Sequence, residues 1–329
     1  MHLTSIDLTD IPGFAFGNWT DEAGGTGCTA IVAPQGAIGG VDVRGGAPAS
    51  RETDLLKPEN TVDRVHAVIL SGGSAFGLEA ASGAARELEA RGIGLNVGPT
   101  VVPIVCSSCI FDLAFGDPNA RPDIAAGAHA VRDALDGPQM PLLQGNHGAG
   151  CGATVGKLAG MERAMKGGLG TSAYALGALR VGALAAVNAC GNVIDPRTSM
   201  PLAGMRAAAD SLEIIDMEDA VLAVANDIAM PLSRTNTTIS CIVTNAKLSK
   251  AQATKISQMA ADAYAHTIRP THTTNDGDTI YALASGAVEC PSDQLDLLGL
   301  MATRALEDAI ASACRHASAS HGVPGFIGQ

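Results

Sequence analysis

The sequence predicts a single α/β domain spanning residues 1–329, and two observations support this prediction. First, short runs of β-branched and apolar residues, bounded by glycine-rich turns, alternate with longer runs rich in Ala, Leu and Glu. The short runs are typical of buried strands and the long runs of helices. Second, no low-complexity linker or internal repeat interrupts the alternation, although the length would accommodate two domains of ordinary size.

Strands are predicted where a β-branched or apolar run meets a turn signal. The clearest are residues 65–70, which precede a glycine-rich turn, and 179–187, a long apolar run that ends at Asn188. Residues 101–113 are an apolar stretch interrupted by Pro103. Further strands or strand regions are expected at 28–33, 41–48, 146–157, 166–171, 239–243 and 279–283, with a hairpin at 189–196.

Helices are predicted at residues 78–91, 123–136, 217–227, 249–267 and 294–317, where helix-forming residues continue for two or more turns. Ser249 is the expected cap of the fourth helix, and Pro270 lies beyond its end. Residues 196–216 are expected to form a loop with a helical patch.

The composition restricts the class of function. A formal net charge of −12 argues against nucleic acid or an anionic membrane as the main partner. No run reaches the length and purity of a membrane span, and no signal-peptide pattern is present, so we expect a cytoplasmic protein. Only Cys106 and Cys109 among the eight cysteines form a CxxC pair, without partners for a zinc site. We expect buried free thiols and no metal.

The stretch from Asn236 leads with two threonines into an apolar, β-branched run. If the bond between Asn236 and Thr237 were cut, Thr237 would become an N-terminus at the start of a rigid strand. Its freed amine could then take the proton of its own hydroxyl, which makes a threonine an effective nucleophile. On this stretch alone, an ordinary edge strand with two solvent-facing threonines is the favoured interpretation.

Two carboxylates, Asp276 and Asp278, flank a glycine just before the strand at 279–283. Residues two apart in an extended segment face the same side, so both carboxylates are expected to point at one place. The alternatives are an ordinary acidic turn or a calcium-like pair, and this segment supplies too few ligands for calcium.

Ser74 lies in a glycine-rich turn between a strand and a helix. The turn lacks the residues of a phosphate-binding P-loop or a dinucleotide fingerprint. It comes closer to the G-x-S-x-G nucleophile elbow, but Phe76 occupies the position of the last glycine. A structural turn is the favoured interpretation, with Ser74 as a nucleophile the alternative.

Two further polar residues stand on predicted strands. Lys157 is noticeable because lysine is scarce in this chain; it is either an ordinary surface lysine or a donor to a substrate carbonyl. Asn188, at the end of an apolar strand, is either a turn cap or an oxyanion donor, and capping is favoured.

Six motifs together resemble the DmpA-like family of L-aminopeptidase/D-esterases, which includes β-peptidyl aminopeptidases and nylon-oligomer hydrolases. The resemblance covers nearly the whole chain. It implies a four-layer α/β/β/α sandwich of the N-terminal-nucleophile type that cuts itself before a Ser or Thr. The motifs are Arg44-Gly45-Gly46-Ala47-Pro48, Arg51-Glu52-Thr53-Asp54, Leu70-Ser71-Gly72-Gly73-Ser74-Ala75-Phe76-Gly77-Leu78, Lys166-Gly167-Gly168-Leu169-Gly170-Thr171, Asn236-Thr237-Thr238-Ile239 and Asp276-Gly277-Asp278-Thr279.

The resemblance also implies roles for individual residues. Thr237 matches the nucleophile, and the cut after Asn236 would leave fragments 1–236 and 237–329. Asp276 and Asp278 match the pair that orients the nucleophile, with Asp at both positions as in the nylon-oligomer hydrolase branch. The remaining matches are Lys157, which that branch places near the nucleophile, and Asn188, which helps to hold the oxyanion. Ser74 and Phe76 are assigned to substrate binding.

The expected function is that of an autoprocessing amide hydrolase or aminopeptidase without a cofactor. Its substrates would be short peptides, amino amides, esters or ω-amino oligomers such as those of 6-aminohexanoate, and the family implies a homotetramer. One alternative is an autoprocessing N-acyltransferase of the ornithine acetyltransferase type. The other is a catalytically silent ligand-binding protein.

Overall fold

The structure is a computed structural model that describes residues 3–138, 140–224 and 236–326. Its helices are α1 (Glu79–Ala90), α2 (Ile124–Asp136), α3 (Met217–Val224), α4 (Lys250–Ala260), α5 (Asp262–Thr267) and α6 (Leu295–Arg315). Its strands are β1 (Thr4–Ile6), β2 (Ala15–Asp21), β3 (Thr26–Val43), β4 (Ser50–Arg51), β5 (Arg64–Ser71), β6 (Leu95–Asn96), β7 (Val101–Val102), β8 (Val105–Cys109), β9 (Thr154–Val155), β10 (Met165–Lys166), β11 (Gly168–Leu176), β12 (Leu179–Asn188), β13 (Asn192–Ile194), β14 (Pro201–Ala203), β15 (Thr237–Lys247), β16 (Ile268–Arg269) and β17 (Thr279–Glu289).

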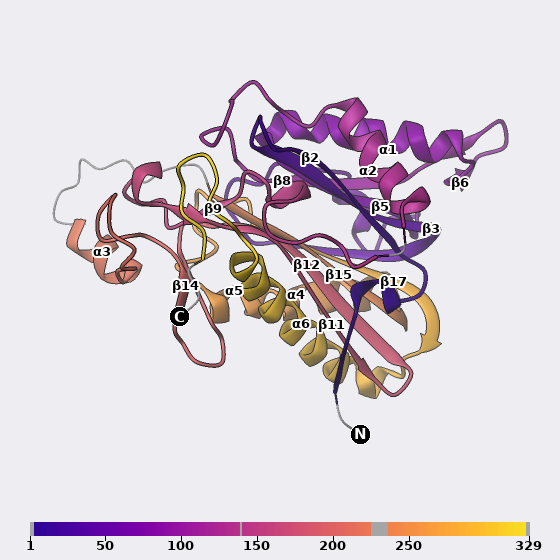
Figure 1. The fold of residues 1–329 in the computed structure, drawn as a ribbon. Coiled ribbons are helices and arrows are strands. Elements are labelled where there is room, and N and C mark those ends of the chain that lie inside the picture. The colour runs from indigo at the N-terminus through magenta and orange to yellow at the C-terminus, as the bar shows by residue number, and fades with distance from the viewer. Residues whose placement is uncertain (1–2, 139, 225–235, 327–329) are drawn as a thin grey trace.

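The main sheet follows the order β1-β11-β12-β15-β17-β3-β5-β8-β4, with β2 also paired to β3. The long strand β3 joins two halves of this sheet. Its first part pairs with β2 and β5, and its last part, residues 38–43, pairs with β17. The register of β3 against β5 shifts between Val32 and Ala37, where the strand passes from one half to the other. Figure 1 shows the two halves stacked on each other.

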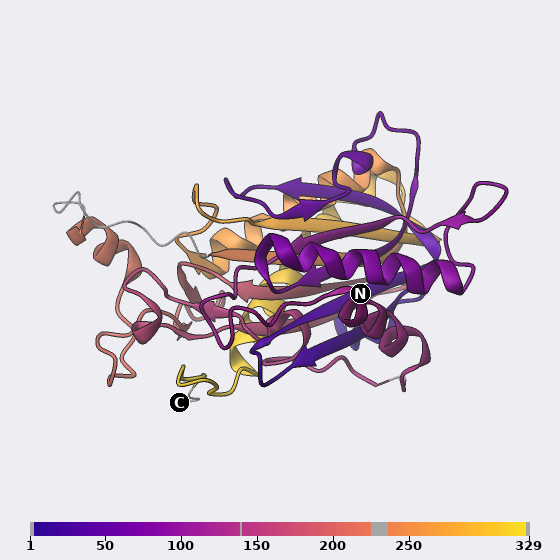
Figure 2. The ribbon, with the colours of Figure 1, turned by 90° about the horizontal axis from the view of Figure 1, so that it is seen from above.

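Three hydrophobic clusters separate four layers. One cluster lies between α1, α2 and the outer face of the β3–β5–β8 half, a second lies between the two halves, and a third packs α4, α5 and α6 on the β11–β12–β15–β17 half. Side chains along β15 alternate between the two faces of the sheet: Ile242 faces the helices, while Cys241 and Val243 face the other half. The predicted α/β/β/α sandwich is therefore confirmed, and the view from above shows α1 across the upper half (Figure 2).

Small residues let these layers approach closely. Gly170 on β11 lies against α6, where an added Cβ would be 2.0 Å from the carbonyl oxygen of Ala309 and 2.4 Å from the backbone nitrogen of Ala313. The backbone of the helix therefore rests almost directly on the strand. Close backbone contacts of this kind let a chain with 39 glycines and few aromatic residues pack its layers without large side chains between them.

Several predicted boundaries are corrected. The strand expected at 28–33 and the strand that begins the segment 41–48 are both parts of β3, which ends at Val43 before the expected turn. The helix expected at 249–267 divides into α4 and α5. In the expected strand region 146–157 only residues 154–155 form a strand, β9; Gly148, with φ +51°, begins a 3-10 helix, and Gly156, with φ +72°, follows β9. The expected hairpin at 189–196 is absent because β13 pairs with β14 and β16. Residues 196–216 contain β14 and no helix.

The last part of the helix expected at 217–227, like the residues just before Asn236, lies outside the described residues. Within the described ranges, no helix combines the length and the apolar character that crossing a membrane requires. In both ribbon views α3 stands away from the layered body (Figures 1 and 2).

We expect Gly170→Ala to destabilise the fold by about 2 kcal/mol or more, because the new methyl group would overlap the backbone of α6. Urea denaturation measures this change. Ser172→Ala, two residues along the same strand, is the control and should change the free energy of unfolding little. Equal stability of both variants would show that α6 does not pack on β11 at the described distance.

Candidate active site

The parallel pairing of β15 with β17 assembles the candidate site. An isolated bridge joins Asn236 to Asp276, and the ladder from Ile239 to Thr244 keeps the same offset of 40 positions (276 − 236 = 40). Thr237 therefore lies beside Gly277, and the next residue of β15 lies beside Asp278. Residues far apart in the sequence meet here because a single register holds them together.

Thr237 opens β15 and is buried, with 5% of its surface exposed. Its hydroxyl donates a hydrogen bond to the carbonyl oxygen of Asn236 and accepts one from the N–H of Gly277 at 3.2 Å. A Cβ on Gly277 would lie 2.9 Å from Thr237 Oγ1, so a glycine lets this N–H reach the hydroxyl. The interpretation as an edge strand with solvent-facing threonines is wrong, because β15 lies between β12 and β17 and both threonines are buried.

Asp276 is a buried residue that pairs with Asn236 and precedes Gly277, whose N–H reaches this hydroxyl. Its Oδ2 accepts a hydrogen bond from the N–H of Thr273 at 2.6 Å. Burial raises the pKa of Asp276, and the nearby charge of Asp278 raises it further; the hydrogen bonds to Thr273 and the charge of Lys157 act in the opposite direction. The net effect raises the pKa of Asp276 above the ordinary value for a carboxyl group.

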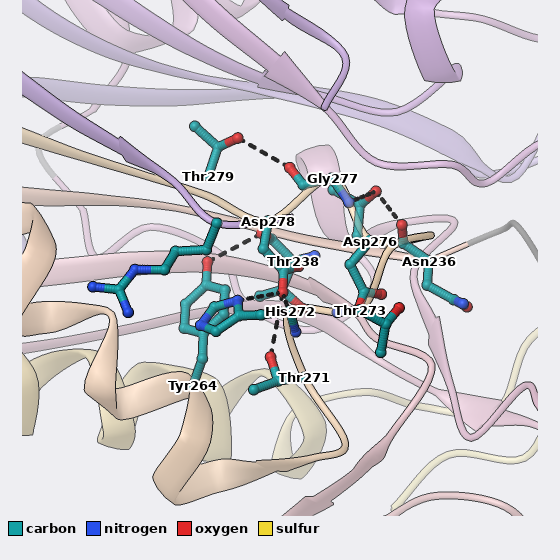
Figure 3. Close-up of polar contacts among 12 residues, drawn as sticks. Asn236, Thr238, Tyr264, Thr271, His272, Thr273, Asp276, Gly277, Asp278 and Thr279 are labelled. Atoms are coloured by element: carbon teal, nitrogen blue, oxygen red, sulfur yellow. Dashed lines mark hydrogen bonds and ion pairs between the residues drawn. The ribbon is translucent and has the colours of Figure 1, made fainter. Parts of the chain in front are cut away.

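Asp278 is held much more tightly. Its Oδ1 accepts from the N–H of Thr238 at 2.7 Å. Its Oδ2 accepts from the backbone N–H of His272 at 3.1 Å, from His272 Nδ1 at 2.8 Å and from the hydroxyl of Thr271 at 3.2 Å (Figure 3). Sequence reasoning missed His272, and its place six residues before Asp278 is the only signal of this contact in the sequence.

Lys157 and Asn188 form the opposite wall of the site. Asn188 pairs with Thr237 across β12 and β15. The ammonium of Lys157 donates to the backbone oxygen of Asn188 at 3.0 Å and to its Oδ1 at 2.7 Å. Burial lowers the pKa of Lys157 to about 7. The interpretation of Lys157 as a surface lysine is therefore wrong, since the residue is only 2% exposed.

The favoured interpretation of Asn188 as a turn cap is also wrong. Its Oδ1 accepts from the N–H of Thr154 at 3.0 Å as well as from Lys157, and its Nδ2 donates to the carbonyl of Phe111 at 2.9 Å. These bonds connect three separate segments of the chain. The side chain is thus fixed at the end of β12, beside the start of β15.

Ser74 and Phe76 occupy the short 3-10 helix Ser74–Leu78 between β5 and α1. Ser74 has φ +53°, and its N–H donates to the carbonyl of Ile110 at 2.9 Å. Phe76 is 58% exposed and lies under the guanidinium of Arg121 at 3.7 Å. No contact among the described residues joins either side chain to Thr237, so the assignment of both to substrate binding stays a prediction.

A cysteine that sequence reasoning did not select borders the site. Cys190 is buried, its thiol is hydrogen-bonded to the side chain of Asn236, and burial raises the pKa of the thiol. All eight cysteines are free, and the CxxC pair lies buried on β8. In the described part of the chain, no group of three or more His, Cys, Asp or Glu side chains could hold a metal ion.

Together these groups suit attack by a hydroxyl on an amide carbonyl. Thr237 supplies the hydroxyl, and the carbonyl of Asn236 is its hydrogen-bond partner. Lys157 and Asn188 supply N–H donors in a buried site, where such donors act most strongly on a developing negative charge. Asp276, which pairs with Asn236 and precedes Gly277, is a carboxyl group with a raised pKa.

The fold is shared with solved structures of hydrolases. An L-aminopeptidase D-Ala-esterase/amidase of Ochrobactrum anthropi, described as a variant of the Ntn hydrolase fold, superposes with a TM-score of 0.72 at 18% identity, covering 98% of this chain and 91% of that one. A Burkholderia β-aminopeptidase superposes with a TM-score of 0.65 at 21% identity, covering 97% of this chain and 90% of that one. At these identities the likeness establishes the fold.

Sequence comparison establishes the family. The profile of peptidase family S58 matches residues 7–327, so the chain belongs to this family and is a hydrolase of peptide or amide bonds. An uncharacterized aminopeptidase of Mycobacterium leprae is 41% identical over 86% of this chain and 79% of its own length. A 6-aminohexanoate-oligomer endohydrolase of Kocuria sp. is 30% identical over 93% of this chain and 85% of its own. The resemblance stated from the motifs is confirmed.

A second buried lysine makes the stability of the fold depend on pH. Lys166 donates to the carbonyls of Cys151 and Ala153 at 2.7 and 2.8 Å, and burial lowers its pKa to about 7, as for Lys157. In the unfolded chain both lysines keep the ordinary pKa of 10.5. Above pH 7 these two lysines therefore bind more protons in the unfolded state than in the folded state, and their contribution favours folding as the pH rises.

We expect the free energy of unfolding to rise between pH 7 and pH 8 by about 1 kcal/mol per pH unit for each buried lysine. Above pH 8 the buried thiols oppose this trend, because the unfolded thiols begin to lose protons near their ordinary pKa of 9.0 while burial raises the pKa of the folded thiols. Urea denaturation at several pH values measures the slope, and Lys166→Met should reduce it by about half. An unchanged slope in that variant would contradict the assignment.

Proposed function

We propose that this chain is a self-processing amide hydrolase with Thr237 as its nucleophile, acting on short peptides, amino amides or ω-amino oligomers. One observation carries the proposal: the hydroxyl of Thr237 contacts the carbonyl of the residue before it and also accepts a hydrogen bond from Gly277. A hydroxyl held in this way is poised toward the bond that must break if Thr237 is to become an N-terminus.

Self-cleavage would begin with attack of Thr237 Oγ1 on the carbonyl carbon of Asn236. The new C–O bond forms, the C–N bond breaks, and the hydroxyl proton passes to the departing nitrogen, which leaves an ester and a free amine. Water then hydrolyses the ester and regenerates the hydroxyl. Lys157 and Asn188 are the donors that we assign to the oxyanion. One such donor typically stabilises the transition state by about 3 kcal/mol.

Turnover would repeat this chemistry on a substrate. The new amine of Thr237, with an ordinary pKa of about 8, would accept the hydroxyl proton as the acyl-enzyme forms. Water would then release the acyl group. Burial supports cleavage as the first event, because Thr237 is only 5% exposed in the continuous chain and a substrate could not reach it.

The relatives support the choice of small amide substrates. The Mycobacterium leprae relative is called an aminopeptidase, and the Kocuria relative a 6-aminohexanoate-oligomer endohydrolase. L-aminoacyl p-nitroanilides and 6-aminohexanoate oligomers are therefore the substrates to test first. Adding amine acceptors would reveal acyl transfer in place of hydrolysis, and a ligand-binding protein without activity would stay uncut and release no product.

We expect the purified protein to consist of fragments 1–236 and 237–329, of 236 and 93 residues (329 − 236 = 93). Thr237→Val should leave one uncut, inactive chain, because it removes only the attacking hydroxyl. Thr238→Val is the matched control and should be cut and active, since the Thr238 hydroxyl has no hydrogen-bond partner among the described residues. Intact-mass spectrometry measures both. Normal cutting of Thr237→Val would refute the proposal.

The two carboxylates should respond differently to neutral replacement. Asp276→Asn should slow turnover at least about tenfold with little loss of stability, since burial already disfavours its charge. Asp278→Asn should also lower the Tm, because an amide nitrogen would face donors on Thr238 or His272. Initial rates and thermal denaturation separate the two effects. Wild-type rates in both variants would remove the acids from the mechanism.

A further inference from the structure

His272 is tied to the candidate site through Asp278. Its backbone N–H and its Nδ1 both reach Asp278 Oδ2, at 3.1 and 2.8 Å. The backbone of His272 has φ +55°, in the left-handed region that few side chains adopt. This conformation brings the backbone N–H and the imidazole to the same carboxylate oxygen (Figure 3).

The direction of these hydrogen bonds follows from the partners. Backbone N–H groups can only donate, and they occupy both oxygens of Asp278, one from Thr238 and one from His272. Both oxygens therefore act as acceptors, so Nδ1 of the imidazole carries the proton and donates it. His272 Nε2 is buried without a hydrogen-bond partner among the described residues, so Asp278 is the group that orients the ring.

Tyr264 also contacts both His272 and Thr238. Its ring stacks on the imidazole of His272, with centroids 5.3 Å apart and 20° between the planes. Its hydroxyl donates to the carbonyl oxygen of Thr238 at 3.1 Å, while Asp278 accepts from the N–H of the same residue at 2.7 Å. The backbone N–H and the backbone carbonyl of Thr238 are thus held by Asp278 and Tyr264, and both of these side chains contact His272.

We propose that His272 is a positioning residue for amide hydrolysis at this site: by clamping Asp278 it fixes the peptide unit between Thr237 and Thr238. The inference rests on the proposed function of Thr237. Fixing that unit restricts rotation of the backbone of Thr237, and with it the direction in which Oγ1 points. Loss of this contact removes no reacting group, but it lets the nucleophile move. Its effect therefore falls on the rate and not on substrate binding.

Three variants isolate the hydrogen bond from the backbone conformation. His272→Gly keeps the left-handed backbone without strain and removes the donor. His272→Asn also tolerates this conformation and offers a side-chain N–H near the position of Nδ1. The control is His266→Ala. His266 on α5 also contacts a carboxylate through Nδ1, that of Glu307 at 2.5 Å, but its side chain is exposed and makes no contact with Asp278 that the structure describes.

The measurements are kcat and KM on an L-aminoacyl p-nitroanilide or 6-aminohexanoate oligomer that the parent hydrolyses, together with intact mass and Tm. We expect His272→Gly to lose about 10- to 100-fold in kcat with KM nearly unchanged. His272→Asn should recover most of that loss, and free imidazole should raise the rate of His272→Gly in proportion to its concentration. His266→Ala should match the parent.

The outcomes separate this inference from the proposed function. If Thr237→Val is inactive and uncut but His272→Gly keeps the parental kcat, Thr237 retains its role and the inference about His272 is wrong. A loss in His272→Gly that imidazole and Asn both fail to restore would also overturn it, because a general structural defect would then explain the loss. If Thr237→Val keeps its activity, the proposed function itself fails.

Discussion

The candidate site depends on the parallel register between β15 and β17. A shift of this register by one residue would move Gly277 away from the hydroxyl of Thr237 and Asp278 away from the N–H of Thr238. The register is well determined because both strands are buried between two hydrophobic clusters, so a slip would turn apolar side chains toward the wrong layer. The packing of the fold thereby determines the position of the nucleophile.

Burial accounts for the electrostatics of the site. Lys157 and Asp276 lie in a region from which water is excluded, and burial shifts the pKa of each toward its neutral form. Neither group is left without partners, since Lys157 is bound to Asn188 and Asp276 to Thr273. Burying two ionisable groups near one threonine lowers the stability of the fold. Ionisable groups with shifted pKa values are common in active sites.

The sequence predicted those parts of the structure that depend on local patterns. The run after Thr237 is β-branched, Ser249 caps its helix as expected, and the acidic pair falls just before a strand. The burial of Lys157 was not predictable from pattern, because a lysine is normally exposed and only the packing of distant segments encloses it. The role of His272 was hidden for a similar reason, since it depends on a left-handed backbone angle and on a carboxylate six residues further along.

The strand order has a consequence for the two fragments that cleavage would produce. Strands β15 and β17, both after residue 236, lie between β12 and β3, both before it. Each fragment therefore supplies neighbouring strands to one continuous sheet, and neither has a complete core of its own. After cleavage the two chains would remain associated under native conditions and separate only in denaturant. Refolding of the cut protein would then be a bimolecular process whose yield depends on protein concentration, unlike that of the intact chain.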